Sequence, residues 1–358
     1  MAVPPFDAQL WGVIEAQPEE VIEAVVADVY ARRPDMAARY GARGRAACLD
    51  DTRYHLRHLA TAVAAAQPAL FADYVGWARA MLTARGIPAD DLAATLEGLR
   101  DALVPRLPQA LQASAHATLA AGLGQLPPAL APLPPASAES APLADLAGAY
   151  LDALLRGERP RAFQLILDAM QAGVALRALY LHVFQRTQHE LGRLWQLNRI
   201  SVAHEHYGTA ATQLIMAQLY PAILATAKTG RRFIGACVTG ELHELGARMV
   251  ADFLELEGWE TYYLGANTPA ESVVRMAVEH QAHVLGISAT MPFHVHAVAA
   301  LVAAVRSAEA CKAVKVLVGG YPFMRAPDLW QRVGADGYAR DAQEAVAVAT
   351  RLVTTGGA

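Results

Sequence analysis

Three residues near the middle of the chain have the types and spacing of a metal-binding loop. Glu241, His243 and Gly246 belong to the run Thr-Gly-Glu-Leu-His-Glu-Leu-Gly at residues 239–246. Glu241 lies two residues before His243 and can hold one nitrogen of its imidazole, which fixes the other nitrogen as a neutral donor to a metal ion. Gly246 has no side chain, so a bulky group can come close to the backbone there. The run therefore predicts an imidazole ligand for a metal ion.

The segments on either side place this loop at the edge of a sheet. The apolar run at residues 233–238 predicts a buried parallel strand. Residues 245–257 predict an amphipathic helix, because Leu245, Met249 and Phe253 fall on one stripe. His243 is then expected at the carboxyl end of the first strand, in the crevice where open α/β sheets bind their ligands.

Further strands follow in the same alternation. They are expected at residues 260–264, 284–288 and 314–318, with a weak fifth at 337–338 and a closing helix at 341–352. The pattern predicts a flavodoxin-like (Rossmann-type) domain over residues 230–358, and we expect no effector domain after it. Polar and small residues follow the third and fourth strands, namely Ser288, Thr290, Gly319, Gly320 and Tyr321.

The order Glu-x-His-x-x-Gly, Ser-x-Thr, Gly-Gly resembles the cobalamin-binding signature, in which Asp is more usual at the first position. The resemblance implies that His243 replaces the cofactor's own benzimidazole as the lower cobalt ligand. It also implies that the Ser288 and Thr290 hydroxyls hydrogen-bond the nucleotide tail, which Gly319 and Gly320 leave room for. The expected cobalamin contacts in these segments are Glu241, Leu242, His243, Glu244, Gly246, Ser288, Thr290, Gly319, Gly320 and Tyr321. The alternative is an ordinary flavodoxin-like domain with glycine turns.

The segment before this domain is helical. Helices are expected at residues 146–155, from 160 to a break at Gly173, at 176–197 and at 201–224. Their short connections predict an antiparallel four-helix bundle over residues 143–229. In cobalamin-binding proteins such a bundle packs over the upper cobalt face.

Within this bundle, Trp195 is followed after nine residues by Glu205 and His206. This spacing resembles the light-sensing cobalamin proteins, in which the Trp, a Val at the position of Val202 and the Glu-His pair surround an upper adenosyl group. The resemblance implies that Trp195 covers the nucleoside and that Glu205 accepts hydrogen bonds from its ribose. Alternatively, Trp195 is a core residue and Glu205-His206 a helix-capping pair. The chain departs from the light-sensing repressors at Gln196, where they have the His that binds cobalt after illumination, so a bis-His photoproduct is in doubt.

The first 124 residues predict only helices. Helices are expected from residue 18 to about 31, from 50 past 63, from 68 past 82 to a stop at 86–88, from 90 to about 104 and up to 123. The domain is globin-like in size and helix content. The proline-dense stretch at residues 125–142 predicts a stiff linker between this domain and the bundle.

Residues 32–58 are rich in arginine and histidine, and Arg53, Arg57 and His58 repeat at helical spacing beside Tyr54 and His55. Three interpretations compete. The first is a solvated basic face. The second is nucleic-acid contact, which the interspersed acids and the lack of a helix-turn-helix signature disfavour. The third is a pocket for an anionic conjugated chromophore, with arginines on its propionates and aromatic rings on its flat system.

Composition limits the class of protein. The 358 residues carry a formal net charge of -4 with 18% charged residues, which gives no overall bias toward nucleic acid. Cys48, Cys237 and Cys311 show no paired spacing. With no signal peptide and no membrane-length apolar run, we expect a cytoplasmic protein without disulfides that contacts no membrane.

The layout of helical domain, linker, bundle and cofactor domain resembles photocobilins, receptors that hold cobalamin and biliverdin together. The resemblance implies a light sensor binding adenosylcobalamin, with biliverdin near Arg53, Tyr54, His55 and His58. Light would change its homo-oligomeric state and regulate a fused or partner effector enzyme. No substrate barrel is predicted, so we expect no enzymatic activity of its own. The alternative is a corrinoid carrier protein serving a methyltransferase.

Overall fold

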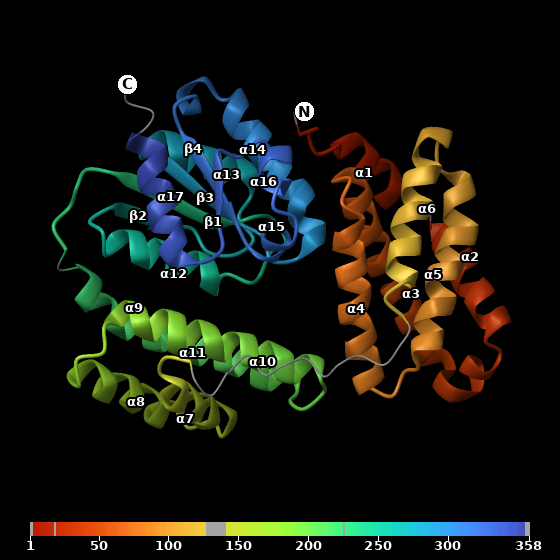
Figure 1. Ribbon diagram of the computed structural model, residues 1–358, viewed down its shortest axis with the longest axis horizontal. Helices are drawn as coiled ribbons and strands as arrows, with labels where there is room; N and C mark the ends of the chain where they lie inside the picture. Colours follow the sequence, from red (N-terminus) through yellow and green to blue (C-terminus); the bar gives the residue numbers. More distant parts are fainter. Residues whose placement is uncertain (1–2, 18, 127–140, 225, 355–358) are drawn as a thin grey trace.

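The computed structural model describes residues 3–17, 19–126, 141–224 and 226–354. The predicted helix start at residue 18 and most of the predicted linker at 125–142 lie outside the described residues. Figure 1 shows three units: a sheet with helices on both faces, a layer of helices beneath it, and a group of upright helices beside both. We call them the α/β unit, the middle helical unit and the N-terminal helical unit.

The described strands of the α/β unit form one parallel sheet in the order β2-β1-β3-β4-β5. They are β1 Arg232–Cys237, β2 Glu260–Tyr263, β3 Val284–Ser288, β4 Lys315–Gly319 and β5 Gly337–Ala339. Cys237 pairs with Ser288, and Ser288 with Gly319, so the carboxyl ends of β1, β3 and β4 meet at one edge. The predicted parallel α/β fold is confirmed, and its order reverses between β1 and β3, where such sheets bind ligands.

Helices cover both faces of this sheet. They are α12 Leu245–Glu255, α13 Ala270–Glu279, α14 Val295–Ser307, α15 Tyr321–Arg325, α16 Leu329–Arg332 and α17 Ala342–Thr354, with 3-10 turns η3 Pro292–His294 and η4 Glu309–Cys311. Under α12 and α17, the buried ring of Phe233 lies across the glycines of two strands. A Cβ on Gly286 would lie 2.4 Å from that ring, so glycine there is a packing requirement.

The middle helical unit contains α7 Ala144–Leu155, α8 Arg159–Gln171, α9 Leu176–Leu179, the π-helical turn η2 Tyr180–Gln185, α10 Arg186–Gln196 and α11 Val202–Leu224. Helices α9, η2 and α10 are continuous and correspond to the helix expected at 176–197. Tyr150, Tyr180 and Phe184 are fully buried at its centre. The Tyr180 hydroxyl donates to Asp252 in α12 over 2.8 Å, which joins this unit to the α/β unit.

The N-terminal helical unit contains α1 Ala8–Glu15, α2 Glu19–Arg32, α3 Asp35–Ala64, α4 Pro68–Ala84, α5 Ala89–Leu103, the 3-10 turn η1 Val104–Arg106 and α6 Gln109–Leu123. Two details differ from the sequence prediction. Helix α1 was not expected, and α3 begins at Asp35 rather than near Asp50. Gly41, with φ of +59°, kinks α3 near its start, and only glycine adopts such a turn without strain.

The N-terminal helical unit is docked on the α/β unit, as Figure 1 shows for α1, α4, α14 and α15. Arg325 of α15 donates to both carboxylate oxygens of Asp73 in α4, each over 2.6 Å. Trp11 of α1 stacks on His296 of α14 with ring centroids 3.8 Å apart. Because α15 follows β4 directly, this docking brings the N-terminal helices to the ligand-binding edge of the sheet.

The glycine that follows β4 allows a test of this edge. Gly320 has φ of +110°, and a Cβ there would lie 2.0 Å from the Ala289 carbonyl oxygen. Gly320→Ala is therefore expected to lower the free energy of unfolding by about 2 kcal/mol or more. The matched control is Gly148→Ala in α7, where a Cβ meets nothing within 4 Å and stability is expected to rise slightly. Chemical denaturation of both variants checks this, and equal stabilities would contradict it.

Candidate functional site

The predicted ligand loop has the geometry that its residues imply. The His243 Nδ1 lies 2.6 Å from Glu241 Oε1, and the His243 backbone N–H donates to the same oxygen over 3.0 Å. Glu241 is completely buried, whereas the His243 side chain is 57% exposed. A carboxylate can only accept here, so Nδ1 carries a proton, and the neutral form of the ring has its lone pair on Nε2. In that neutral form His243 presents a nitrogen donor at the switch point of the sheet.

The second oxygen of Glu241 is held by the segment after β3. Glu241 Oε2 accepts from the backbone N–H groups of Thr290 (2.6 Å) and Met291 (3.0 Å) and from His294 Nδ1 (3.0 Å). Burial by itself would raise the pKa of Glu241, but the hydrogen bonds from His243, His294 and the backbone outweigh it and hold that pKa well below its usual range. Glu241 is therefore a carboxylate throughout the physiological range.

His294 was not among the predicted site residues. Its only sequence signal is its position, four residues after Thr290 in the loop that follows β3. The side chain is buried, and its Nε2 lies 3.1 Å from where a Cβ on Gly240 would stand. Gly240 (φ +83°) thus provides both the turn and the space for this ring.

The other predicted contacts after β3 and β4 share this edge. Ser288 and Gly319 end neighbouring strands in direct register, and Tyr321 begins α15 with an exposed ring. Beside the ligand loop, a Cβ on Gly246 would meet nothing within 4 Å, and Leu242 is 72% exposed. An accessible imidazole, open space at Gly246 and hydroxyl-bearing residues beyond it fit a bulky metal-centred cofactor.

Glu244 has a different environment from its neighbours in the loop. Its Oε1 accepts from Gln213 of α11 over 2.7 Å, and its Oε2 accepts from the Tyr263 hydroxyl and the Ala266 backbone N–H, each over 3.0 Å. Both oxygens are therefore engaged within the protein. In this structure Glu244 fastens the loop to α11 and to β2, and its predicted contact with the cofactor stays a prediction.

The residues predicted to surround the upper group lie together at one end of the middle helical unit. Trp195 is in the last turn of α10, and Val202, Glu205 and His206 are in the first turn of α11. His206 Nδ1 lies 2.6 Å from Glu205 Oε2, and Val202 and His206 are exposed. The Glu205 charge acts on His243, so this turn lies near the ligand loop. Their contacts with an upper group stay predictions.

Gln196 points away from this turn. It is buried, and its side-chain amide donates to the Trp77 carbonyl of α4 over 3.1 Å. Arg85 at the end of α4 donates to the carbonyls of Trp195 (3.1 Å) and Gln196 (2.9 Å), and its guanidinium lies 5.2 Å from the Trp195 ring centroid. The N-terminal helical unit therefore holds the end of α10 that carries Trp195.

Part of the predicted chromophore pocket is a tight aromatic cluster. His55 Nδ1 lies 2.7 Å from the Tyr74 hydroxyl, and His58 stacks on Tyr74 at 3.5 Å between centroids. The edge of His58 also faces Phe293 of η3 at 5.2 Å. Both histidines are buried, and burial lowers the pKa of His55 to about 4. Tyr54 is 49% exposed and borders the same Phe293 ring.

Arg53 pairs with acids rather than with this cluster, and its predicted contact with a bilin stays a prediction. It pairs with Glu19 of α2 and with Asp50. Other arginines of residues 32–58 are likewise paired with acids, among them Arg39 with the buried Asp91. The spacing of the arginines along the helix does not determine their partners, because their long side chains pair with the nearest carboxylates. Arg57 is the arginine that faces the cluster, with its guanidinium 4.3 Å from the Phe293 centroid.

The aromatic cluster and the α3–η3 contact contain buried polar atoms without a hydrogen-bond partner in the described part of the chain. Both ring nitrogens of His58 and the Nε of Arg57 make no hydrogen bond within the described part of the chain. Buried nitrogens of this kind are costly unless a ligand or water satisfies them. The α3–η3 contact therefore has hydrogen-bonding capacity that the described residues do not use.

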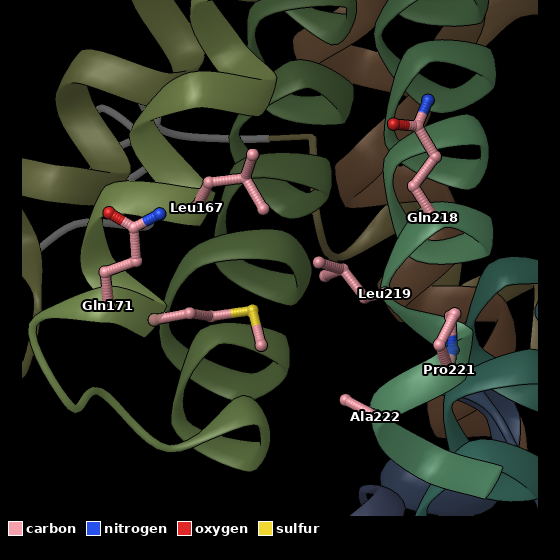
Figure 2. Close-up of a pocket in the computed structure, with 7 residues that line it drawn as sticks. Leu167, Gln171, Gln218, Leu219, Pro221 and Ala222 are labelled. Atoms are coloured by element: carbon pink, nitrogen blue, oxygen red, sulfur yellow. The ribbon is translucent and has the colours of Figure 1, made fainter.

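A separate groove lies at the far end of the middle helical unit. It has a volume of about 370 Å³ and is lined by Leu167, Met170 and Gln171 of α8 and by Gln218, Leu219, Pro221 and Ala222 of α11. Figure 2 shows the residues of α8 and those of α11 on the two sides of the groove, with Leu167 and Leu219 toward the space between the helices. Leu219 is fourteen residues beyond Glu205, about 21 Å along the helix, so the groove is distinct from the cofactor site.

Family models match three parts of the chain. Residues 231–347 match a model described as B12 binding domain, and residues 146–220 match a second model with the same description. Residues 8–154 match the model described as Phycobilisome protein. No described helix is long and apolar enough to cross a membrane.

Known proteins resemble the C-terminal half. The chain is 31% identical over 169 residues to dimethylamine corrinoid protein 2 of Methanosarcina mazei, covering 46% of this chain and 77% of that protein. It is 33% identical over 153 residues to the HTH-type transcriptional repressor CarA of Myxococcus xanthus, covering 42% and 51% respectively. The structure of the Methanosarcina barkeri monomethylamine corrinoid protein matches 59% of this chain and 99% of its own, with a TM-score of 0.53 and 23% identity, which supports the fold alone.

The imidazole loop, the strand-end residues and the sheet order define a B12-binding protein, in agreement with the matched models. More narrowly, the chain belongs to the family of corrinoid proteins that these relatives represent. Cobalamin binding is thus supported. The relatives agree with the corrinoid carrier better than with the light sensor, and the narrower photocobilin identity, the adenosyl form and biliverdin go beyond what they show.

The Glu241–His243 pair predicts a pH dependence. The hydrogen bond to Glu241 raises the pKa of His243 above its usual 6.5. In the cofactor-free protein the pair contributes stability that is complete below pH 6.5 and is lost as pH rises through the higher folded-state pKa. Because Nε2 must be unprotonated to bind cobalt, cobalamin binding through His243 is expected to weaken as pH falls through that same value.

This dependence is measured by NMR titration of the His243 ring, assigned with His243→Ala. Glu241→Gln removes the charge that raises the pKa, so the pKa is expected to move back toward 6.5. An unchanged pKa in the Glu241→Gln protein would show that the carboxylate does not control the imidazole.

Proposed function

We propose that the chain is a light sensor that binds adenosylcobalamin through His243 and a linear tetrapyrrole, biliverdin, through its N-terminal helices. The carrying observation is the N-terminal helical unit, which matches the phycobilisome protein model and is docked on the cobalamin site. The proposal includes two details of the fold. The N-terminal helical unit is globin-like, and the middle helical unit is a four-helix bundle.

On the cobalamin side, the cofactor supplies a cobalt–carbon bond that light breaks. His243 holds the lower face in its neutral form, oriented by Glu241. Trp195 and the first turn of α11 with Val202, Glu205 and His206 cover the upper group. Loss of that group would remove what these side chains pack against, and the two packings of the turn would form a bistable element.

On the N-terminal side, the bilin would bind against the half-exposed ring of Tyr54, at the edge of the cluster in which His55, His58 and Tyr74 pack on one another. The unpartnered nitrogens of His58 suit the polar edge of a tetrapyrrole, and Arg57 takes the part first expected of Arg53, an ion pair with a propionate. Phe293 joins this cluster to the cobalamin loop. The bilin would thus lie beside the cobalamin and widen the range of absorbed colours.

The proposed output is a change in assembly rather than a reaction. Release of the upper group alters the exposed surface of α10 and α11, which would change a homo-oligomer and so act on a partner or fused effector enzyme. The sensor has no catalytic activity of its own in this proposal, and it works in the cytoplasm.

A second candidate is a corrinoid carrier that serves a methyltransferase. The names of the dimethylamine corrinoid relatives favour it directly. A carrier must present the upper cobalt face to its partner. In this chain Arg85 and Gln196 join the end of α10 to α4. The N-terminal helical unit would therefore stand beside the upper cobalt face. This position is the specific reason for preferring the sensor.

Absorption spectra separate the two candidates. The protein is purified with adenosylcobalamin and biliverdin, and its spectrum and light-scattering mass are recorded before and after green light. The sensor predicts a light-induced change of the cobalamin bands together with a change in mass. If light alters neither, and the protein instead accepts a methyl group from a methylated corrinoid donor, the carrier is the correct function.

Matched variants test the bilin site. His58→Ala removes a buried ring from the cluster and is expected to weaken biliverdin binding by about tenfold, as for one lost hydrogen bond to a buried group. Arg53→Ala, at an arginine that pairs with Glu19 of α2, is the control and is expected to bind like wild type. Titration of the bilin absorption band measures both. Equal binding by the two variants would place the bilin elsewhere.

A further inference from the structure

The end of α10 that carries Trp195 is held by the end of α4. Arg85, the residue that follows α4, donates to the backbone carbonyls of Trp195 (3.1 Å) and Gln196 (2.9 Å). The last carbonyls of a helix receive no N–H from a following turn, and a positive charge is favourable beside them. The Arg85 guanidinium therefore supplies both hydrogen bonds and charge to the C-terminal end of α10.

The same contact reaches the indole ring of Trp195. The Arg85 guanidinium is 5.2 Å from the centroid of this ring, a distance at which a cation is attracted to an aromatic face. The Trp77 ring of α4 lies 6.1 Å from the same indole, and the Trp77 carbonyl accepts the Gln196 side-chain amide over 3.1 Å. Arg85 is itself fixed by a hydrogen bond to the Met81 carbonyl of its own helix over 2.9 Å. The indole and the backbone that bears it thus have their partners in α4.

We propose that Arg85 is a positioning residue for Trp195, and through Trp195 for the upper group of the cobalamin. It fixes the last turn of α10 with two hydrogen bonds and the indole with its charge, so the indole is aimed before the cofactor binds. A side chain that is already ordered loses less conformational entropy on binding than a mobile one. The inference rests on the proposed place of Trp195 over the adenosyl group and is independent of biliverdin and of assembly.

Helix α4 gives Arg85 a wider reach. Tyr74, Trp77 and Arg85 fall on one stripe of this helix, and the Tyr74 ring stacks on His58 in the aromatic cluster. Arg85 is eleven residues beyond Tyr74, about 16 Å along the helix. A displacement of α4 at the aromatic cluster would therefore reach the end of α10 through one rigid element.

The test is a double-mutant cycle on Arg85 and Trp195, measured as affinity for two forms of cobalamin. Adenosylcobalamin carries the upper group that Trp195 covers in the proposed function, and hydroxocobalamin lacks it. Arg85→Ala, Trp195→Ala and the double variant are titrated with each form by calorimetry in the dark, after chemical denaturation has established folding. If Arg85→Ala does not fold, Gln196→Leu removes the amide bond to α4 instead and is expected to weaken binding of adenosylcobalamin alone.

We expect Arg85→Ala and Trp195→Ala each to bind adenosylcobalamin about tenfold more weakly, and the double variant to lose no more than Trp195→Ala. Affinity for hydroxocobalamin is expected to stay unchanged, because that form offers no nucleoside to the indole. Arg85→Lys keeps the charge without the planar fork, so its affinity for adenosylcobalamin is expected between those of wild type and Arg85→Ala. The control Gln67→Ala removes a contact with Asp328 (2.8 Å) at the other end of α4 and is expected to bind both forms like wild type.

Four results would overturn the inference alone, given a weakened Trp195→Ala protein. They are an unchanged affinity of Arg85→Ala for adenosylcobalamin, equal losses for the two forms, additive losses in the double variant, or a Gln67→Ala protein as impaired as Arg85→Ala. A Trp195→Ala protein that binds adenosylcobalamin like wild type would instead remove Trp195 from the upper group, and with it the proposed cover and this inference. One set of titrations thus separates the two failures.

Discussion

The site depends on one buried negative charge. A carboxylate without solvent contact is stable only when its oxygens are fully hydrogen-bonded, and Glu241 meets this condition with donors from its own loop and from the loop after β3. Those loops are adjacent only because β1 and β3 are neighbours in the sheet. The aim of the His243 imidazole is therefore a consequence of strand order.

The same edge is where the three units meet. Gln213 of α11 reaches the ligand loop through Glu244, Arg325 of α15 reaches α4, and Phe293 of η3 reaches α3. Each unit thus touches the site through a loop that begins at a strand end. A change of packing in one unit bears directly on the other two, without a long chain of intervening contacts.

The shared fold leaves the role of the cofactor open. The middle helical unit and the α/β unit each match a B12-binding model, and corrinoid relatives match this half of the chain, so that half supports cobalamin binding and agrees best with carriage. What differs is the N-terminal helical unit and its ties to Trp195 and Phe293. These contacts between the units are what favours light sensing.

The sequence by itself determined the parallel α/β fold and the pairing of Glu241 with His243, because strand periodicity and a two-residue spacing are local properties. It also placed Ser288 and Gly319 at strand ends. These two residues are neighbours because β3 and β4 are adjacent in the sheet. Only the tertiary structure decided that His294 shares Glu241, that Gln196 turns toward α4 and that Arg57 rather than Arg53 faces the aromatic cluster. These contacts join residues far apart in the chain, and the direction of a long side chain depends on partners that no local pattern names.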